Sequence, residues 1–578
     1  MSGFLQDNNE TSLLGDTGNN LPLTHAPSRS IFCRLSLSSV IIIAYALLLL
    51  VIGGGPQWAL TLHEVRVAQP AREMLHDGHW ILPSFAGKPR LVKPPTTSWV
   101  VASILHLTGR TDEWIVRLPA NLMGVGLALL TGCLTARWLG EFAGCIAGLI
   151  QITTYYILLQ ARLAEADIFL AAMVGLAMVC FAWGVVPNSD GHVSTSRWLS
   201  ILFYVAAAWA FLFKGPIGPA FIFLGCTVYL ILQRDRRGLG FLCNAPGLAA
   251  FFLIALPWPI AAYLEYPPIL EIWKHEIFGR AAGELGRSDS FFSYFWNIPM
   301  MLMPWTPLVI VGIIAGWRLG WWRKPIGRFL AAWFLAGMLV ILLCAWKHKH
   351  YAIPILPPLT IPAAGCVLLW ISRTPPPNGR CRHGLIAAGF LIACVATVTV
   401  ILCLNPAGTR SMALLGIPLA CGGLAVIGFD HCRRPVAILV SLFATAAVLI
   451  LGVERFVLPH YDLYRPSAEL GQRIARDIPR DQTIYLLSMG EAQISYYIPF
   501  PMFRIDNLAN IPEEVATIPS QTLYVVGPRY AIDALGPFGQ LEILDRANGL
   551  RRRETERDRI TFARLIRSSV RSPPVSLK

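Results

Sequence analysis

Long apolar runs, separated by short polar loops, make up most of this chain. The first run covers about residues 38–55, and twelve more follow before residue 454. Most are close to the roughly 20 residues that an α-helix needs to cross a bilayer. The pattern therefore predicts an α-helical polytopic membrane protein with about 13 transmembrane helices. The later spans are expected at 119–137, 142–159, 168–186, 199–213, 216–232, 244–262, 296–316, 328–345, 351–371, 384–404, 411–428 and 435–453.

The pattern changes after residue 453. Ile484–Leu487 and Thr522–Val526 are short apolar runs typical of strands, and Ser467–Ile478 has helical periodicity. We therefore expect a small soluble α/β domain at the C-terminus, large enough for its own core. The predicted units are a polar tail (1–37), a membrane domain (38–453) that contains a long polar loop (57–118), and the C-terminal domain (454–578).

Composition supports the membrane interpretation. Hydrophobic residues make up 55% of the chain and charged residues 14%, whereas soluble proteins carry about 25% charged residues. The net charge of +14 does not indicate a nucleic-acid partner, because the Lys and Arg residues lie mostly in short loops between apolar runs. The 13 cysteines include no Cys-x-x-Cys pair, so neither a zinc site nor a disulfide framework is predicted.

The distribution of positive charge predicts the orientation. Arg29 and Arg34 precede the first span, which places the N-terminus in the cytoplasm. Of the six loops then expected on the cytoplasmic side, five are basic and one is neutral. Residues 57–118, called the first outer loop below, and the C-terminal domain are therefore expected on the outer face.

Charge is concentrated in the first outer loop. His63, Glu64 and Arg66 lie in an amphipathic segment, 62–78, which we expect to lie along the interface, with Pro70 kinking it or starting a second helix. Charge beside a membrane is costly unless it has a role. The alternative interpretation is an anchoring helix with solvated charges.

Lys93 lies in the same loop, directly before a Pro-Pro pair. Proline restricts the residue before it, so the backbone at Lys93 is stiff and extended. A lysine held in this way suits a phosphate as a point charge. The alternative is a lysine that only extends from the interface towards water.

Two further candidate groups lie at the outer ends of later spans. Asp167, with Glu165 before it, opens a span, and Arg162 precedes both as a candidate for substrate binding. Lys214 stands at a Lys-Gly-Pro break between apolar runs, where a cation can line a cavity. The alternative for Lys214 is an ordinary loop lysine.

The last group is Lys347, His348, Lys349, His350 and Tyr351, at another outer boundary. Because this cluster is external, orientation signalling does not account for it, and it forms a candidate anion site. Cations and carboxylates from distant loops thus converge on one membrane face. That pattern suits an anionic lipid substrate whose phosphate leaves during the reaction.

These motifs resemble those of a known family. The run HEVRVAQPAREMLHDGHWILPSFAGKPRLVKPPTTSW, followed by EWIVRLPA, RLAEADIF, FLFKGPIG and KHKHYAIPILPPL, is similar to the bacterial GT-C glycosyltransferases. The similarity is to the undecaprenyl-phosphate-aminoarabinose transferases of lipid A and to related protein mannosyltransferase-like enzymes. It covers about residues 57–360 and thins after residue 380.

The resemblance implies an inverting glycosyltransferase in the bacterial inner membrane. Its donor is a sugar on polyprenyl phosphate, its acceptor is lipid A or another envelope glycolipid on the periplasmic face, and it requires no cofactor. It implies catalytic roles for Glu64, Asp167 or His63. Donor and substrate binding is implied for Arg66, Lys93, Lys214 and the cluster of Lys347, Lys349, His350 and Tyr351.

Two positions depart from the family pattern. His63 stands where the family has an acid, so Glu64, Asp167 or His63 itself remains open as the base. Val92 stands where a Glu often precedes the Lys-Pro, which weakens the case for a divalent metal. A protein or glycan acceptor also remains open, and a transporter or flippase of lipid-linked sugars is the alternative from another class.

Overall fold

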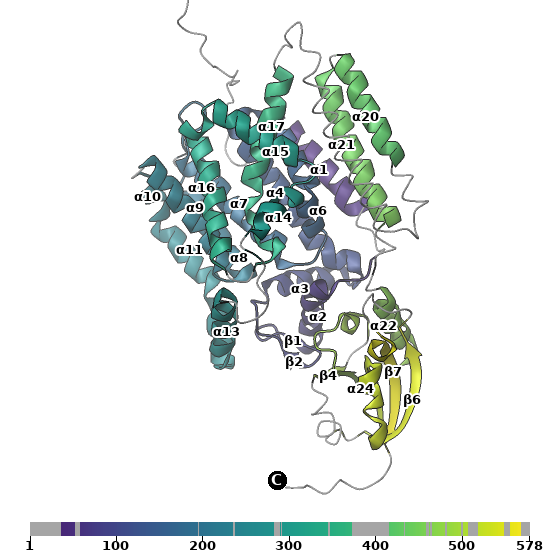
Figure 1. Cartoon of the computed structure of the whole chain (residues 1–578). Coiled ribbons are helices and arrows are strands. Elements are labelled where there is room, and N and C mark those ends of the chain that lie inside the picture. Colours follow the sequence, from purple (N-terminus) through teal and green to yellow (C-terminus); the bar gives the residue numbers. More distant parts are fainter. Residues whose placement is uncertain are drawn as a thin grey trace, which may run out of the picture.

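In the computed structural model, the described residues are 36–52, 58–194, 196–234, 237–282, 290, 292–344, 347–372, 416–432, 434–457, 462, 465–479, 482–498, 501–506, 518, 520–547 and 555–567. They form a helical bundle, with a smaller sheet-containing unit at one end (Figure 1). The expected span at 384–404 lies outside the described residues.

Helices account for all of the bundle. They are α1 (Leu37–Leu47), η1 (Leu48–Ile52), α4 (Glu113–Leu139), α5 (Glu141–Thr153), α6 (Tyr155–Ala161), α7 (Ala166–Val185), α8 (Arg197–Lys214), α9 (Ile217–Gln233), α10 (Arg237–Leu242), α11 (Ala245–Ala255), α12 (Pro257–Glu265), α13 (Ile269–Ala282), α14 (Ser293–Met301), α15 (Thr306–Arg318), η2 (Trp321–Arg323), α16 (Pro325–Leu343), η3 (Lys349–Ile355), α17 (Pro357–Ser372), α20 (Gly416–His431), α21 (Pro435–Gly452) and η4 (Val453–Val457).

Within the described residues, six helices are long and apolar enough to cross a membrane, or up to nine if each of three bent pairs is one span. The bends are 68° between α5 and α6, 104° between α14 and α15, and 56° between η3 and α17. The helix α7 is apolar on all sides and largely buried, as expected of a helix at the centre of a bundle. It packs against α4 and α8.

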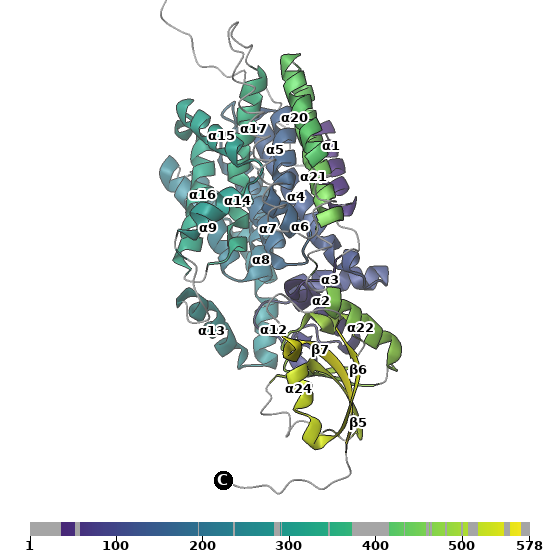
Figure 2. The same cartoon turned by 45° about the vertical axis from the view of Figure 1, so that its right-hand side comes forward.

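The first outer loop is folded rather than extended. It contains α2 (Leu62–Asp77), a two-stranded hairpin of β1 (Ser84–Phe85) and β2 (Lys88–Pro89), and α3 (Thr96–Thr108). The predicted helix over 62–78 is confirmed, and it continues through Pro70. The loop lies between the bundle and the C-terminal sheet (Figure 2).

The C-terminal unit is built on a five-stranded mixed sheet of order β4-β3-β5-β7-β6. The strands β4 and β5 run parallel to β3, whereas β7 is antiparallel to β5 and β6. The helix α22 begins this unit, and α24 follows β5 directly. The elements are α22 (Arg465–Asp477), β3 (Ile484–Leu487), η6 (Gln493–Tyr497), β4 (Met502–Ile505), β5 (Thr522–Pro528), α24 (Arg529–Asp533), η8 (Gly536–Phe538), β6 (Gly539–Arg546), η9 (Glu556–Asp558) and β7 (Ile560–Arg567).

The first outer loop and the C-terminal unit share one hydrophobic core. Val65 of α2 and Val101 of α3 belong to the same buried cluster as Leu470, Ile484 and Ile494. A second cluster packs α24 against β3, β4, β5 and β7. The sheet is therefore held between α24 and the first outer loop, which fixes the position of the loop relative to the bundle end.

Candidate active site

Glu64 is a buried carboxylate at the start of α2. With Thr61 it forms a reciprocal capping box, in which the Thr61 backbone N–H donates to Glu64 Oε2 at 2.9 Å and the Glu64 N–H donates to Thr61 Oγ1. Arg117 of α4 donates to both carboxylate oxygens, at 2.7 and 3.0 Å. The Ala164 backbone N–H donates to Oε1 at 3.2 Å. Glu64 therefore ties the first outer loop to α4 and to the segment before α7.

Asp167 and Lys214 form a second ion pair at the same end of the bundle. Asp167 lies in the first turn of α7, and its carboxylate accepts a hydrogen bond from Lys214 Nζ. Lys214 is the last residue of α8, because Gly215 adopts a positive φ of 73° that ends the helix. Lys214 Nζ also lies 4.6 Å from the centroid of the Tyr351 ring. Residues from α7, α8 and η3, which are far apart in the sequence, therefore lie together.

The Lys347–Tyr351 cluster lies beside this ion pair. The His348 and His350 rings stack with centroids 5.0 Å apart, and Tyr351 contacts both rings. His350 is close enough to Asp167 for their charges to interact. Lys347 is buried and donates to the Cys344 carbonyl at 3.0 Å, whereas Lys349 is exposed. The structure therefore brings His350 and Tyr351 to the Asp167–Lys214 pair.

His63 and Lys93 reach the same place from the first outer loop. Both keep part of their surface exposed, and the charges of Arg66, Lys93 and Asp167 act on His63. Partial desolvation, together with Arg66 and Lys93, lowers the pKa of His63 below its usual 6.5, against the opposing effect of Asp167. His63 is therefore neutral at pH 7, the form that can accept a proton.

Glu165 is a half-buried carboxyl group at the N-cap of α7. Desolvation, with smaller contributions from the Asp167 and Glu64 carboxylates, raises its pKa to about 8 against the opposing charges of Lys93 and Lys214. Most copies of this group are therefore protonated at pH 7.

Two predicted binding residues form ion pairs with other parts of the fold. Arg66 Nε lies 2.7 Å from Glu491 Oε2 of the C-terminal unit. Arg162 forms an ion pair with Glu454 of η4. The charge of Arg66 also acts on His63, which places Arg66 at the edge of the candidate site. Arg162 instead links the segment before α7 to the end of α21.

Three indole groups hold the segment that leads to Lys93. Trp273 Nε1 donates to the Leu91 carbonyl at 2.9 Å, and Trp258 Nε1 donates to the Ile81 carbonyl at 3.0 Å. Trp99 Nε1 donates to the Trp80 carbonyl at 2.8 Å. The loop around Lys93 is thus fixed by donors from α3, α12 and α13.

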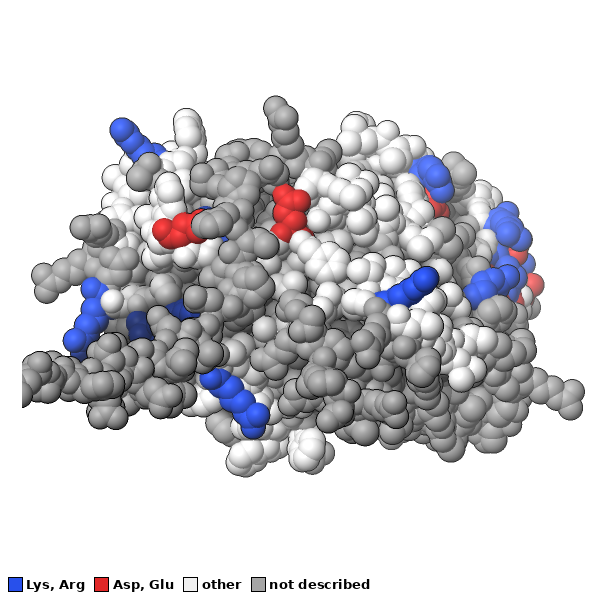
Figure 3. All heavy atoms as spheres, turned by 90° about the horizontal axis from the view of Figure 1, so that it is seen from above, with Lys and Arg blue, Asp and Glu red and all other residues white. Residues whose placement is uncertain are grey.

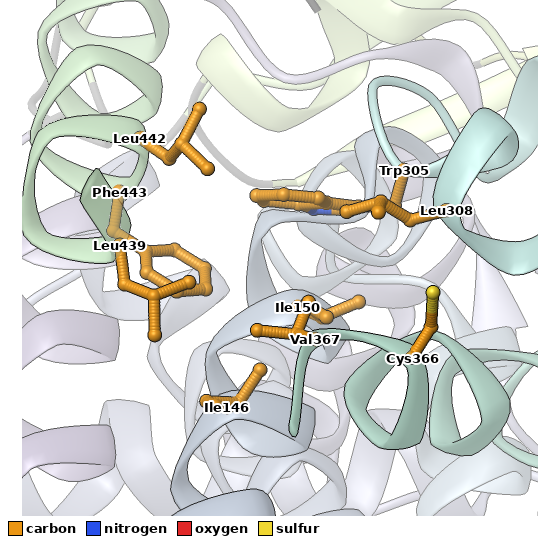
Figure 4. Close-up of a pocket in the computed structure, with 9 residues that line it drawn as sticks. All are labelled: Ile146, Ile150, Trp305, Leu308, Cys366, Val367, Leu439, Leu442 and Phe443. Carbon is orange, nitrogen blue, oxygen red and sulfur yellow. The ribbon is translucent and has the colours of Figure 1, made fainter. Parts of the chain in front are cut away.

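A small apolar pocket, partly open to its surroundings, lies between α5, α15, α17 and α21 (Figure 4). Its lining carries no charged group that could bind a phosphate or move a proton. It is formed by Ile146, Ile150, Trp305, Leu308, Cys366, Val367, Leu439, Leu442 and Phe443. Among the described residues, no group of three or more His, Cys, Asp or Glu side chains could hold a metal ion.

Sequence reasoning missed the partners of several candidates. Arg117, the counterion of Glu64, lies in the EWIVRLPA motif but was not predicted to act there. Its position directly before the apolar span at 119–137 was the available signal, because an arginine at a membrane boundary that becomes buried needs a carboxylate. Glu491 gave no such signal, because a carboxylate is common in a polar segment and no motif surrounds it.

Comparison with known proteins shows which sequences and structures this chain is similar to. Residues 35–272 match the model of the dolichyl-phosphate-mannose-protein mannosyltransferase family. An undecaprenyl phosphate-α-4-amino-4-deoxy-L-arabinose arabinosyl transferase of Edwardsiella ictaluri is 28% identical over 362 residues, which cover 61% of this chain and 63% of that protein. The same-named protein of Aeromonas salmonicida is 26% identical, over 63% of this chain and 67% of its own length. The chain thus matches less than two thirds of the Edwardsiella relative.

Solved structures show the fold over a longer range. ArnT from Cupriavidus metallidurans, in its crystal structure bound to undecaprenyl phosphate, has a TM-score of 0.73 at 20% identity, covering 93% of this chain and 99% of that one. The oligosaccharyltransferase of Archaeoglobus fulgidus has a TM-score of 0.51 at 12% identity, over 87% and 71% of the two chains. The predicted resemblance is confirmed as a similarity: the chain resembles these transferases in sequence, shares the fold of ArnT, and carries the apolar helices of a multi-pass membrane protein.

Proposed function

We propose that this chain is an integral membrane glycosyltransferase that moves a sugar from a polyprenyl phosphate donor, undecaprenyl phosphate in bacteria, to an envelope acceptor. The observation that carries the proposal is the gathering of His63, Lys93, Asp167, Lys214 and His350 at the end of the bundle that meets the first outer loop. The cations Lys93 and Lys214 outnumber the one carboxylate of this group, Asp167, so the negative charge of a lipid phosphate can balance the excess. The names of the relatives favour 4-amino-4-deoxy-L-arabinose as the sugar. Lipid A as the acceptor follows from the resemblance of the sequence motifs.

The cations bind the donor phosphate. Lys93, Arg66, Lys347 and Lys349 stabilise the negative charge that grows on the phosphate as the bond from the anomeric carbon to its oxygen breaks. The acceptor oxygen forms the new bond to that carbon, and the polyprenyl phosphate leaves with the electron pair. Lys214 holds Asp167 beside the reacting groups, and Tyr351 packs against Lys214. No nucleotide takes part in this step.

His63 is the proposed proton acceptor when the acceptor group is a hydroxyl. Its lowered pKa leaves it neutral at pH 7, and Asp167 lies close enough to stabilise the imidazolium that forms. Glu64 is less suited to this role because Arg117, Thr61 and Ala164 already donate to its oxygens. An acceptor phosphate would already be ionised and would need no base, so lipid A phosphates and hydroxyl acceptors differ in their need for His63.

The proposed topology has about 13 spans in the bacterial inner membrane. The N-terminus is cytoplasmic, and the first outer loop and the C-terminal domain are periplasmic. Supporting this, the end of the bundle remote from the C-terminal unit shows scattered Lys and Arg residues and fewer acidic ones among its coloured atoms (Figure 3). Positive charge favours the cytoplasmic side.

The test is transfer by the full-length protein in liposomes, with radiolabelled undecaprenyl-phosphate-aminoarabinose and lipid A. We expect labelled lipid A, and release of undecaprenyl phosphate in equal amount. His63→Gln should slow transfer to a hydroxyl acceptor roughly 100-fold and transfer to a phosphate much less. Movement of the labelled lipid across the membrane without cleavage of the sugar–phosphate bond would overturn the proposal.

A further inference from the structure

One carboxylate of the C-terminal unit binds two arginines of the first outer loop. Glu491 Oε2 lies 2.7 Å from Arg66 Nε, and Glu491 Oε1 lies 2.8 Å from Arg90 Nε. The Glu491 side chain is 22% exposed and that of Arg90 is 15% exposed, so this bridge is largely shielded from water. Shielded ion pairs with such short contacts hold their side chains in place better than exposed pairs do.

Arg66 stands between this bridge and the candidate site. On one side its charge acts on Arg90, and on the other it acts on His63, which Lys93 also influences. The Arg90 guanidinium repels the Arg66 guanidinium, whereas the Glu491 carboxylate attracts it. The Arg66 side chain remains 35% exposed. A guanidinium has five N–H donors, so one whose Nε side lies against a carboxylate can still present its Nη groups to a phosphate.

We propose that Glu491 is a positioning residue, which holds Arg66 at the angle from which it binds the phosphate of the polyprenyl donor. The C-terminal domain thereby takes part in donor binding through its contact with Arg66. The inference rests on the proposed function, because it takes the phosphate of the lipid donor as the ligand of Arg66.

Other contacts fasten the C-terminal unit to the loop without involving Arg66. Arg72 donates to the backbone carbonyls of Tyr496 and Ile498, at 2.6 and 2.8 Å. The hydroxyl of Tyr496 donates to the Thr111 carbonyl at 2.8 Å. These bonds, together with the shared hydrophobic core, should keep the two parts docked when the Glu491 charge is removed.

Asp506 offers a matched control at the same interface. Its carboxylate pairs with Lys88 of β2 at 3.6 Å and with Arg504 of β4 at 3.0 Å. Neither partner is a proposed donor ligand. Asp506→Asn therefore removes one interface carboxylate, as Glu491→Gln does, without touching Arg66.

The direction of the effect separates positioning from simple electrostatics. If Glu491 acted only through its charge, its removal would leave more positive potential near the donor phosphate and would tighten binding. If Glu491 holds Arg66 in place, its removal lets Arg66 move away from the phosphate and weakens binding. The positioning role therefore predicts a rise in Kd, opposite to the electrostatic effect.

The experiment measures binding of undecaprenyl phosphate to the full-length protein in detergent, with wild type, Glu491→Gln, Asp506→Asn, Arg66→Ala and the Arg66→Ala/Glu491→Gln double variant. We expect Glu491→Gln to raise the Kd roughly three- to tenfold, and Asp506→Asn to leave it within a factor of two. In the Arg66→Ala background, Glu491→Gln should have no further effect, because it acts through Arg66.

Unchanged or tighter binding by Glu491→Gln would overturn the positioning role. So would an equal loss in Asp506→Asn, which would indicate general loosening of the interface, or a further loss in the double variant. If the wild-type protein does not bind undecaprenyl phosphate at all, the proposed donor is overturned instead. This outcome is distinct from failure of the positioning role, because it appears in the wild type without any substitution.

Discussion

Two carboxylate–cation pairs lie close together at the end of the bundle, and their surroundings differ. Glu64 is fully buried, and Arg117, Thr61 and Ala164 all donate to it. Asp167 is also buried and pairs with Lys214, yet its further electrostatic neighbours include Lys93 and His350. The first pair is enclosed by bonds within the fold, whereas the second also faces the Lys93 cation and the His350 ring.

This difference distinguishes a carboxylate that stabilises the fold from one that can take part in the reaction. A buried carboxylate whose oxygens already accept several bonds holds elements together, and breaking it leaves an uncompensated buried charge. A carboxylate among surplus cations leaves room for an anion to complete the balance. Glu64 and Asp167, equal candidates for the base by sequence, are therefore expected to respond differently to substitution.

The largest expected effect follows removal of the Glu64 charge. Glu64→Ala leaves Arg117 buried without its carboxylate and should lower the free energy of unfolding by about 3–5 kcal/mol. A lower Tm of the purified protein in detergent would report this loss. Asp545→Ala, which breaks the half-exposed pair with Arg473, is the control and should cost less than about 1 kcal/mol. An unchanged Tm with lost transfer would make Glu64 catalytic and remove the contrast.

Lys93 should give the opposite result. Because it is exposed and proposed to bind the donor phosphate, Lys93→Ala should lower kcat/KM about 100-fold while leaving the Tm unchanged. Lys88→Ala, in the same loop but paired with Asp506, should change kcat/KM by less than about threefold. Equal losses in the two variants would show that the general charge of the loop, rather than a placed lysine, attracts the donor.

The Asp167–Lys214 pair should behave as one unit. We expect Asp167→Asn and Lys214→Met each to lower the rate of transfer about ten- to thirtyfold, and the double variant to be no slower than the worse single variant. A coupling free energy of about 1–2 kcal/mol would then emerge from the double-mutant cycle. Independent, additive losses would indicate that the two residues act on the substrate separately.

The smallest expected effect is a change in the pH dependence of stability at Glu165. Its pKa is raised from 4.5 to about 8 in the folded protein, so its contribution to stability is fully present below pH 4.5 and is lost as the pH rises through about 8. Glu165→Gln should therefore flatten the fall of Tm between pH 4.5 and about 8 by about a few degrees. Parallel curves for the two proteins would contradict the raised pKa.

Most of the helical framework was predictable because it depends on local pattern. Apolar runs indicated the positions of helices such as α4, α7 and α16. The predicted strands at Ile484–Leu487 and Thr522–Val526 are confirmed. The other strands of this sheet, β4, β6 and β7, were not predicted.

The pairing of the charges was not predictable in the same way. Glu64 and Arg117 are 53 positions apart, and Asp167 and Lys214 are 47 apart. Their contacts depend on helix packing that a single sequence does not specify, although each residue was recognisable as costly in its place. The role of Glu491 required the docking of two units and could not be read from its neighbours in the chain.

The three indoles that bind the carbonyls of Trp80, Ile81 and Leu91 bear on the kinetics of donor capture. A loop ordered during folding loses no backbone freedom when its ligand arrives. Association at Lys93 should then proceed at a rate set by two-dimensional diffusion of the lipid and by its orientation, and not by closure of the loop. Replacing Trp273 by phenylalanine would slow association more than it would speed dissociation, and so would make this loop a determinant of the on-rate.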